Sequence, residues 1–372
     1  MSETTTQVTA AVVRETGRFE IEQATLGPPK PDEVLVKVVA AGLCHTDLVV
    51  RDQVYPVPLP VVLGHEGAGV VEAVGSAVQK VQPGDHVAMS FLHCGYCRPC
   101  LDGAIASCAN FNALNFAGHR PDDSHALTLA DDTTVSDRFF GQSAFATHAI
   151  AHESNVVPVR KDAPLEIVGP LGCGVQTGAG AVWRALDVTP GSSFAVTGTG
   201  AVGLSAVMAA RVAGATTIIA VDIVPSRLEL AQELGATHTI NSKEQDVVEE
   251  LKKLTDDQGV DFALDTTGIP ALIVQAVEGL RQRGKAAVVG ASKGDAVIEL
   301  PANAFMQSTK TLRGVVEGDS VPDVVVPQLL DLYMQGRFPL DKLVRYYDFD
   351  QINQAASDTA SGDAIKPILR MP

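Results

Sequence analysis

The sequence predicts a two-domain α/β protein in which a β-rich domain accompanies a doubly wound parallel sheet. The chain has 372 residues, which is more than one ordinary domain. Its first part contains short apolar or alternating runs separated by Pro and Gly clusters, a pattern typical of strands. From about residue 187 the pattern becomes an alternation of strands and helices, which is typical of a doubly wound parallel sheet.

The expected elements follow from the local pattern in chain order. In the β-rich part the expected strands are Ala10–Val13, Val34–Val39, Gly69–Val74 and His86–Met89. In the second part we expect a helix at Ala201–Ala213 and strands at Ser193–Thr197, Thr217–Asp222, Asp261–Asp265 and Ala286–Gly290. After about residue 316 the alternation becomes less regular. This change indicates a nucleotide domain inserted into a β-rich domain that the chain later rejoins.

Composition and charge exclude several classes of protein. Apolar residues make up 46% and charged residues 19%, which is a globular balance. The formal net charge of −16 repels phosphate backbones, so we expect no nucleic-acid partner. Residues 1–6 contain neither a basic region nor an apolar core, and no apolar stretch is long enough to cross a membrane. We therefore expect a cytoplasmic protein.

Four of the six cysteines form one compact motif. Cys94, Cys97, Cys100 and Cys108 follow one another within 15 residues, a spacing that indicates metal ligation. An iron–sulfur cluster fits less well, because the fourth cysteine is distant and no proline follows it. A redox CxxC motif would explain only two of the four. We predict a closed tetrahedral zinc site that stabilises a lobe and performs no chemistry.

A glycine-rich motif lies between the expected strand at Ser193–Thr197 and the helix that follows it. Gly198, Gly200 and Gly203, with Ala201 and Val202 between the last two, match the dinucleotide-binding pattern GxGxxG. In such a loop the glycines allow a tight turn, approach of the pyrophosphate and close packing of the helix. The helix N-terminus offers free N–H groups to the phosphates. The motif therefore predicts a dinucleotide site.

The end of the next expected strand indicates which dinucleotide binds. Asp222 lies 19 residues after Gly203, where a carboxylate accepts hydrogen bonds from an adenosine ribose. The same carboxylate repels a 2′-phosphate, and Ile223 offers no compensating charge. NAD is therefore favoured over NADP. Arg227 is either a second contact to the ribose or a solvated helix residue.

Three further residues predict an open metal site. Cys44, His65 and Cys173 together provide two thiolates and one imidazole, the ligand set of catalytic zinc with a fourth position open. A lone buried cysteine or histidine is usually structural, so the prediction depends on the three residues as a set. Such a metal lowers the pKa of an alcohol so that an alkoxide forms near neutral pH.

The motifs together resemble those of the zinc-containing medium-chain alcohol dehydrogenases, and the match covers essentially the whole chain. Within that family the sequence is most similar to the bacterial aryl-alcohol (benzyl alcohol) dehydrogenases. The segments that carry this similarity are residues 44–47, 51–53, 55–60, 170–180 and Gly314-Val315-Val316-Glu317-Gly318.

The resemblance implies the domain organisation and several residue roles. It implies a GroES-like catalytic domain at residues 1–174 and 316–372, with a structural zinc lobe at about 93–110. A Rossmann NAD-binding domain would occupy residues 175–315. The implied roles are proton acceptance by Thr46, orientation of the zinc-bound imidazole by Asp47, an acid behind the zinc at Glu66, a nicotinamide contact at Thr177, a carboxamide contact through the backbone of Val289, and pyrophosphate contacts at Lys366 and His45. For Lys366 the alternative is a solvent-exposed lysine.

One residue departs from the family pattern. Where well-studied relatives carry a histidine at the outer end of a proton relay, this chain has Val49. We hypothesise that the proton passes from Thr46 through the ribose hydroxyls to water, with help from His45.

The substrate is expected to be a small alcohol. Phe91, Phe139 and Phe140 fall in segments that line the alcohol channel in relatives, and such walls favour a benzyl or allylic alcohol. Each of the three residues could equally be ordinary core. A medium-chain aliphatic alcohol and the glutathione adduct of formaldehyde are the enzymatic alternatives. A catalytically silent zinc- and nucleotide-binding scaffold is the non-enzymatic alternative, and a homodimer or homotetramer is the expected assembly.

Overall fold

The computed structural model describes residues 5–372. Of residues 1–6, which contain neither a basic region nor an apolar core, residues 1–4 lie outside the described residues. The chain divides into two compact units. The first unit comprises the chain up to Cys173 together with Val321–Gln335 and Leu340–Pro372, and the second comprises Gly174–Ser320 and Gly336–Pro339. No helix among the described residues is both long and apolar enough to span a membrane.

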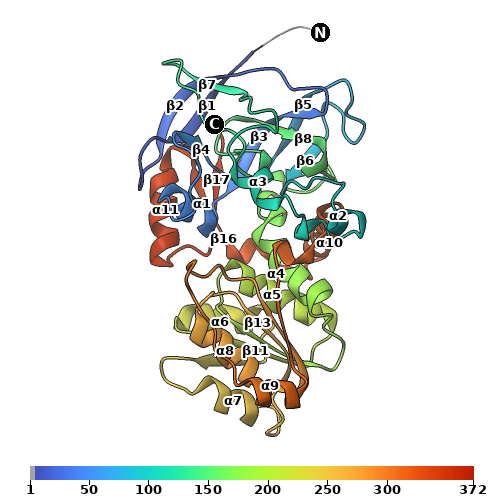
Figure 1. Cartoon of the computed structure of the whole chain (residues 1–372). Helices are drawn as coiled ribbons and strands as arrows, with labels where there is room; N and C mark the ends of the chain where they lie inside the picture. The colour runs from blue at the N-terminus through green and yellow to red at the C-terminus, as the bar shows by residue number, and fades with distance from the viewer. Residues whose placement is uncertain (1–4) are drawn as a thin grey trace. The chain divides into compact units, whose positions relative to one another are not determined.

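The first unit is built around two sheets (Figure 1). One sheet has the order β4-β1-β2-β7, and the other has the order β16-β17-β3-β5-β6-β9, with β8 paired to β3. The strands are β1 (Thr6–Val13), β2 (Glu20–Leu26), β3 (Glu33–Gly42), β4 (Val61–Val62), β5 (Glu66–Val74), β6 (His86–Met89), β7 (Leu127–Leu129), β8 (His148–His152), β9 (Val156–Val159), β16 (Val344–Asp348) and β17 (Lys366–Arg370). The helices are α1 (His45–Arg51), α2 (Arg98–Leu101), α3 (Phe111–Phe116), α10 (Pro322–Met334) and α11 (Ile352–Ser361).

The longest strand of this unit, β3, joins distant parts of the chain. It pairs antiparallel with β5, β8 and β17. Eight of its ten residues are buried, many of them consecutive, so both faces of this strand are covered for most of its length. The pairing of Ile368 with Gly42 brings the end of the chain next to the segment that begins at Cys44.

The second unit contains a six-stranded parallel sheet, as the alternation predicts. Its order is β12-β11-β10-β13-β14-β15, which is the doubly wound order 3-2-1-4-5-6. The strands are β10 (Ser193–Thr197), β11 (Thr217–Asp222), β12 (His238–Asn241), β13 (Val260–Asp265), β14 (Leu280–Val288) and β15 (Thr311–Gly314). The helices are α4 (Gly174–Gly180), α5 (Ala201–Ala213), α6 (Pro225–Leu234), α7 (Val247–Lys253), α8 (Pro270–Glu278) and α9 (Ala302–Ser308).

The element boundaries in this unit reflect local chemistry. Helix α5 ends at Ala213 and is capped by Gly214, whose φ of 86° suits a residue without Cβ. Helices α6 and α8 begin with proline, whose missing N–H costs nothing at the first helical position. The sequence predicted a strand at Ala286–Gly290, whereas β14 ends at Val288. A Cβ on Gly290 would lie 2.1 Å from the backbone nitrogen of Gly268. After Val288 the chain therefore packs closely against the loop at Gly268.

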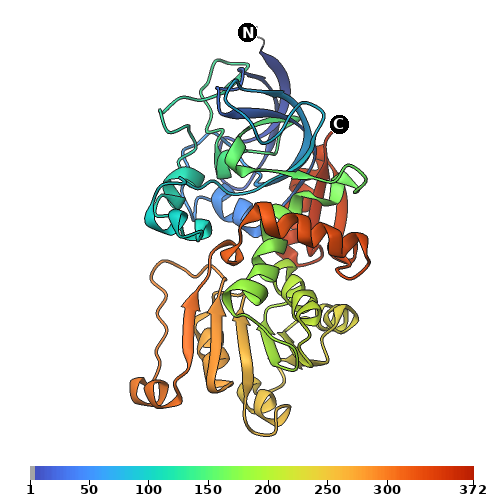
Figure 2. The same cartoon turned by 90° about the vertical axis from the view of Figure 1, so that its right-hand side faces the viewer.

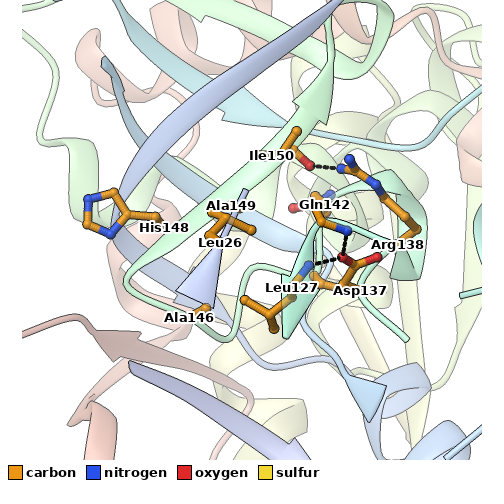
Figure 3. A pocket seen from close by; sticks show the side chains of 11 residues that line it. Leu26, Leu127, Asp137, Arg138, Gln142, Ala146, His148, Ala149 and Ile150 are labelled. Carbon is orange, nitrogen blue, oxygen red and sulfur yellow. Dashed lines mark hydrogen bonds between the residues drawn. The ribbon is translucent and has the colours of Figure 1, made fainter. Parts of the chain in front are cut away.

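A group of buried charges connects three segments of the first unit. Arg120 donates two hydrogen bonds of 2.8 Å to the carboxylate of Glu33, and Arg138 donates a third of 2.6 Å. All three residues are less than 9% exposed. Arg138 also donates to the carbonyl of Ile150, beside a small cavity (Figure 3). In the same view, the Asp137 carboxylate accepts from the backbone N–H of Leu127 at 2.6 Å.

Candidate active site

Four ligand-type side chains from separate segments of the first unit meet beside β5. Cys44 lies at the N-cap of α1, His65 and Glu66 lie where β5 begins, and Cys173 follows the 3₁₀ turn Gly169–Gly172. One ligand atom from each of the four residues lies within 4.8 Å of the others. The site is therefore assembled from segments more than 100 residues apart.

Glycines beside the ligands allow the segments to approach one another. Gly64, directly before His65, has a φ of 91°, and a Cβ there would lie 2.5 Å from the backbone nitrogen of Phe145. A Cβ on Gly172, directly before Cys173, would lie 2.1 Å from the carbonyl oxygen of Met89. A larger residue at either position would displace a metal ligand.

Asp47 connects the two chain segments that carry Cys44 and His65. Its fully buried carboxylate accepts hydrogen bonds from Nδ1 of His65 at 2.9 Å, from the N–H of Gly64 at 3.1 Å and from the N–H of Cys44 at 2.9 Å. The contact to Nδ1 leaves Nε2 of His65 as the ring nitrogen with a lone pair for a metal.

The electrostatic environment favours charge at both Cys44 and His65. Burial opposes protonation of His65, but the carboxylate of Asp47 and the neighbouring Cys44 raise the pKa of the imidazole well above its usual value. The hydrogen bond with Cys173 lowers the pKa of Cys44 well below its usual value, against the effect of burial. The charge of Lys366 acts in the same direction. The surroundings thus favour a thiolate and a positive charge at one point, and a metal ion held by the thiolate and the neutral imidazole would supply that positive charge.

The residues present fit a zinc ion. Nε2 of His65 is buried, and among residues 5–372 it has no hydrogen-bond partner. Two cysteine sulfurs lie close to it, and the combination of thiolate and imidazole is a preferred ligand set of zinc. The hydroxyl of Thr46 lies 3.9 Å from Sγ of Cys44, on the first turn of α1.

Glu66 and Lys366 form a buried ion pair behind these ligands. Nζ of Lys366 lies 2.8 Å from both carboxylate oxygens of Glu66, and the two residues are 2% and 0% exposed. Burial raises the pKa of Glu66 and the contact with Lys366 opposes this effect. For Lys366 the charge of Glu66 outweighs burial and raises the pKa of the ammonium group. Because both contacts are short and equal, we describe the pair as ionised.

This geometry decides between two interpretations of Lys366. The lysine is buried, so the solvent-exposed alternative is wrong. Its bonds to Glu66 occupy two of its three donors. The pyrophosphate contact stays a prediction. The ion pair with Glu66 was not predicted, because the partners are 300 residues apart in the sequence.

Two of the three phenylalanines contact the imidazole of His65. The ring of Phe140 stacks on it, with a centroid separation of 4.6 Å and an interplanar angle of 27°. The ring of Phe139 meets it edge-on at 5.3 Å. Phe91 instead packs on Phe111 at 5.8 Å. Phe140 has a φ of 49°, an unusual backbone conformation for an aromatic residue and a form of strain that accumulates at functional sites.

The other four cysteines form the second cluster. The sulfur atoms of Cys94, Cys97, Cys100 and Cys108 all lie within 4.8 Å of one another, and none is in a disulfide. Backbone N–H groups donate to these sulfurs, as from Cys97 to Cys94 at 3.4 Å and from Cys94 to Cys108 at 3.3 Å. Burial opposes ionisation of Cys94, but nearby backbone donors lower its pKa to about 6. The cluster fits a structural zinc ion.

The glycine motif of the second unit has the geometry that the sequence predicts. Gly198 has a φ of 88° in the turn after β10, and Gly200 is the N-cap of α5. A Cβ on Gly203 would lie 1.9 Å from the carbonyl oxygen of Gly198, so the helix packs there only with glycine. Ala201 and Val202 form the first turn of α5.

Asp222 at the end of β11 is held by more donors than the sequence indicated. One carboxylate oxygen accepts from the N–H and from Oγ1 of Thr199, both at 2.6 Å. The other accepts from the N–H groups of Ile223 at 2.7 Å and Val224 at 3.0 Å. Burial raises the pKa of Asp222, but these donors outweigh it and lower the pKa. Sequence reasoning missed Thr199, although its place inside the glycine motif could have identified it.

The remaining predicted residues occupy the following positions. Arg227 is half-buried in the first turn of α6, and Val289 follows β14 with its N–H donating to the carbonyl of Asp265 at 2.9 Å. Thr177 lies in α4, and His45 is exposed at the start of α1. Their roles toward the cofactor stay predictions.

An open metal site of two thiolates and one imidazole, in a chain that also carries a doubly wound nucleotide-binding sheet, defines the class of zinc-dependent dehydrogenases. Comparison with known families places the chain more closely. Residues 30–161 match the alcohol dehydrogenase GroES-like domain, and residues 201–334 match the zinc-binding dehydrogenase family. The chain belongs to the zinc-containing medium-chain alcohol dehydrogenases.

Individual relatives agree with this assignment. The geraniol dehydrogenase of Castellaniella defragrans is 44% identical over 97% of this chain and 96% of its own length. The solved structure of benzyl alcohol dehydrogenase from Acinetobacter calcoaceticus is 52% identical and has a TM-score of 0.95. It covers 99% of this chain and 100% of that one. An alcohol dehydrogenase zinc-binding domain protein from Burkholderia ambifaria is 58% identical over 99% and 100% of the two chains, with a TM-score of 0.98.

These findings establish the coarse activity. The protein is a zinc-dependent alcohol dehydrogenase with two candidate zinc sites and a nucleotide-binding domain. The predicted fold class and the predicted family are confirmed.

Proposed function

We propose that the protein oxidises a primary aryl or allylic alcohol to the aldehyde, reversibly, with NAD as hydride acceptor. The observation that carries this proposal is the contact of Phe139 and Phe140 with the imidazole of His65. Aromatic side chains next to a metal ligand favour a flat substrate with a π-system. The benzyl alcohol and geraniol dehydrogenases among the relatives support the same substrate class.

Different residues of the first unit would bind the metal, accept the proton and orient the metal ligands. Cys44, His65 and Cys173 would hold a zinc ion that would supply Lewis acidity toward the alcohol oxygen, and NAD would be the hydride acceptor. Thr46 would accept the hydroxyl proton, and its hydroxyl lies 3.9 Å from Sγ of Cys44, one of the residues that would hold the metal. Asp47 fixes the orientation of His65 throughout.

The proton then leaves the site without the usual histidine, because Val49 occupies that position in α1. We infer that it passes to water through the ribose hydroxyls, with His45, exposed at the start of the same helix, assisting. Replacing His45 by Gln would then shift the pH dependence of kcat, and an unchanged profile would exclude this assistance.

The choice of NAD over NADP rests on Asp222. Its carboxylate is held by four donors, and these donors favour its charged form. A fixed negative charge at this point of a doubly wound sheet accepts ribose hydroxyls and repels a 2′-phosphate. Ile223, the next residue, is exposed and adds no positive charge.

The sheet of the second unit also supports a homo-oligomer. Strand β15 forms one edge of that sheet, and Val297 and Met306, in the chain just before it, are 71% and 63% exposed. An uncovered edge is suited to pairing with a second copy. Light scattering that gave the mass of one chain would refute this part of the proposal.

The experiment that tests the activity follows NADH formation with benzyl alcohol, geraniol, hexanol, ethanol and S-hydroxymethylglutathione. We expect fast, chelator-sensitive turnover of benzyl alcohol or geraniol, slow turnover of ethanol, and little reaction when NADP replaces NAD. Thr46→Val is the control that keeps the metal ligands intact, and it should retain zinc while losing turnover. Preference for the glutathione adduct or for hexanol would refute the aryl or allylic class. Zinc binding without turnover of any alcohol would favour the scaffold.

A further inference from the structure

A buried carboxylate at the end of the nucleotide-binding sheet has no role in the function proposed so far. Glu317 lies three residues after β15, in the motif Gly314-Val315-Val316-Glu317-Gly318, and is only 9% exposed. Its φ is 48°, and those of Gly318 and Asp319 are 66° and 52°. Three consecutive left-handed residues, two of them not glycine, form a strained turn of the kind that occurs at functional sites.

The strained turn is fixed against α4. A Cβ on Gly318 would lie 2.6 Å from the carbonyl oxygen of Gln176 and 2.7 Å from that of Thr177, so only glycine allows this approach. Ser320, which is fully buried, donates to the carbonyl of Gln176 at 3.3 Å. Asp319 accepts from Arg313 at 2.5 Å on the other side. The position of the Glu317 carboxylate is therefore determined by the fold.

The carboxylate contacts two side chains of α4. Oε2 of Glu317 accepts from the hydroxyl of Thr177 at 3.4 Å and from Nε2 of Gln176 at 3.5 Å. Both contacts are long, but both bring a polar hydrogen toward the same oxygen, which favours a negative charge there. The hydrogen bond also fixes the rotation of the Thr177 side chain, and with it the direction of its methyl group.

The topology of the sheet places this group beside one half of the dinucleotide. The glycine motif after β10 and Asp222 after β11 lie at the half of the sheet that takes the pyrophosphate and the adenosine. In a doubly wound sheet the second nucleotide lies outside the carboxyl ends of the other three strands, here β13, β14 and β15. Figure 2 shows these strands side by side with parallel direction. Glu317 follows the carboxyl end of β15, on the nicotinamide side.

We propose that Glu317 is a positioning residue that favours the oxidised nicotinamide. The inference rests on the proposed use of NAD. The nicotinamide ring carries a positive charge in NAD and none in NADH, so a fixed negative charge nearby stabilises the oxidised form relative to the reduced form. The alcohol and NAD are thereby stabilised on the enzyme relative to the aldehyde and NADH. Thr177, held by Glu317, defines the wall against which the ring rests.

The test compares the dissociation constants of NAD and NADH in the wild type and in Glu317→Gln. Gln has the same shape and still accepts the hydrogen bond from Thr177, but it lacks the charge. We expect the ratio of the NAD to the NADH dissociation constant to rise about tenfold, as a single partly screened charge would produce. NADH binding is followed by its fluorescence, and NAD binding by displacement of NADH.

Two variants separate the charge from the packing. Glu317→Asp retains the charge and should keep the ratio within about threefold of the wild type, whereas Glu317→Ala should raise it as Gln does. Glu278→Gln, an exposed carboxylate at the end of α8, is the matched control and should change nothing. If Glu317→Gln weakens both cofactor forms equally, or changes neither, the inference is overturned and the use of NAD still stands. If the wild type binds neither form, the proposed function itself fails.

Discussion

At the scale of single residues, the active site depends on a few carboxylates that each hold several groups. Asp47 is bonded to His65, Gly64 and Cys44, which belong to two segments of the chain. Asp222 is bonded in the same manner by Thr199, Ile223 and Val224. Replacing one of several donors to a buried carboxylate removes a single hydrogen bond, whereas replacing the carboxylate itself disturbs all of them. We therefore expect the second substitution to have the larger effect on the site.

The first prediction concerns Asp47→Asn. The amide nitrogen of Asn cannot accept the hydrogen bond that Oδ2 of Asp47 now accepts from the N–H of Cys44 at 2.9 Å. The orientation of both metal ligands is disturbed, so we expect zinc affinity and kcat/KM to fall roughly 10- to 100-fold. Metal analysis and alcohol oxidation measure the two effects. Asp52→Asn, at the other end of α1 on a more exposed carboxylate, should leave both unchanged.

The second prediction concerns Thr199→Val. Val has the same shape as Thr but lacks the hydroxyl that donates to Asp222 at 2.6 Å. Because this donor holds the carboxylate in place for the ribose, we expect the dissociation constant of NADH to rise roughly five- to tenfold and the discrimination against NADPH to decrease. Fluorescence titration with both cofactors measures this change. Thr216 is an exposed residue whose hydroxyl donates to the carbonyl of Gly191, so Thr216→Val should bind NADH normally. An unchanged affinity in Thr199→Val would contradict the role given to its hydroxyl.

At the scale of elements, the sequence predicts what depends on local spacing. The glycine motif specifies a strand, a turn and a helix within 21 residues, and the structure has β10 and α5 at the predicted residues. The four-cysteine loop is similarly local. The ion pair of Lys366 with Glu66 is not predictable in this way, because it depends on the pairing of β17 with β3 and of β3 with β5. The left-handed backbone conformation of Phe140 also cannot be predicted from a pattern of apolar residues.

The third prediction concerns the cysteine loop, which has little secondary structure of its own. Within it α2 has four residues and one 3₁₀ turn has three, so most of its order must come from the metal. We expect Cys97→Ser to reduce the zinc content from two ions to one. Amide hydrogen exchange in residues 94–110 should then become faster by at least an order of magnitude.

The comparison variant for this prediction is Cys44→Ser, which removes a ligand of the other site. It should also retain one zinc ion, but the loop should keep its slow exchange and alcohol oxidation should be abolished. If residues 94–110 exchange equally slowly in the wild type and in Cys97→Ser, the metal is not what orders the loop.

At the scale of the whole molecule, the first unit is connected by buried charge as well as by apolar packing. Glu33 begins β3, and its carboxylate accepts from Arg120 and Arg138, which come from the long segment between β6 and β8. This segment has few strands to hold it, with only β7 in regular pairing. The ion pairs therefore attach it to the sheet. The sequence did not predict these ion pairs, because the partners are 87 and 105 residues apart.

The last prediction is that Glu33→Gln destabilises this unit in a pH-dependent manner. Burial raises the pKa of Glu33, but the hydrogen bonds and charges of Arg120 and Arg138 outweigh it and lower the pKa below 4.5. A carboxyl whose pKa is lower in the folded state contributes stability above its unfolded pKa and loses it as the pH falls through the folded value. At pH 7 the variant leaves two buried guanidinium groups without the carboxylate to which both donate. This costs about 3 kcal/mol, or roughly 5–10 °C in melting temperature.

The pH dependence distinguishes loss of the Glu33 charge from poor packing of the Gln side chain. As the pH falls below the usual pKa of a glutamate, the wild type begins to lose this contribution, and it is lost fully once the pH passes the lowered pKa of Glu33 in the folded protein. The difference in melting temperature between wild type and variant should therefore narrow over this range. Glu22→Gln is the matched control, because Glu22 contacts Arg14 at 2.7 Å but both side chains are partly exposed. Such a pair contributes about 0–1 kcal/mol, so its loss should lower the melting temperature by no more than about 3 °C. A Glu33→Gln variant that melted like Glu22→Gln at pH 7 would show that apolar packing, not the buried charges, attaches the segment.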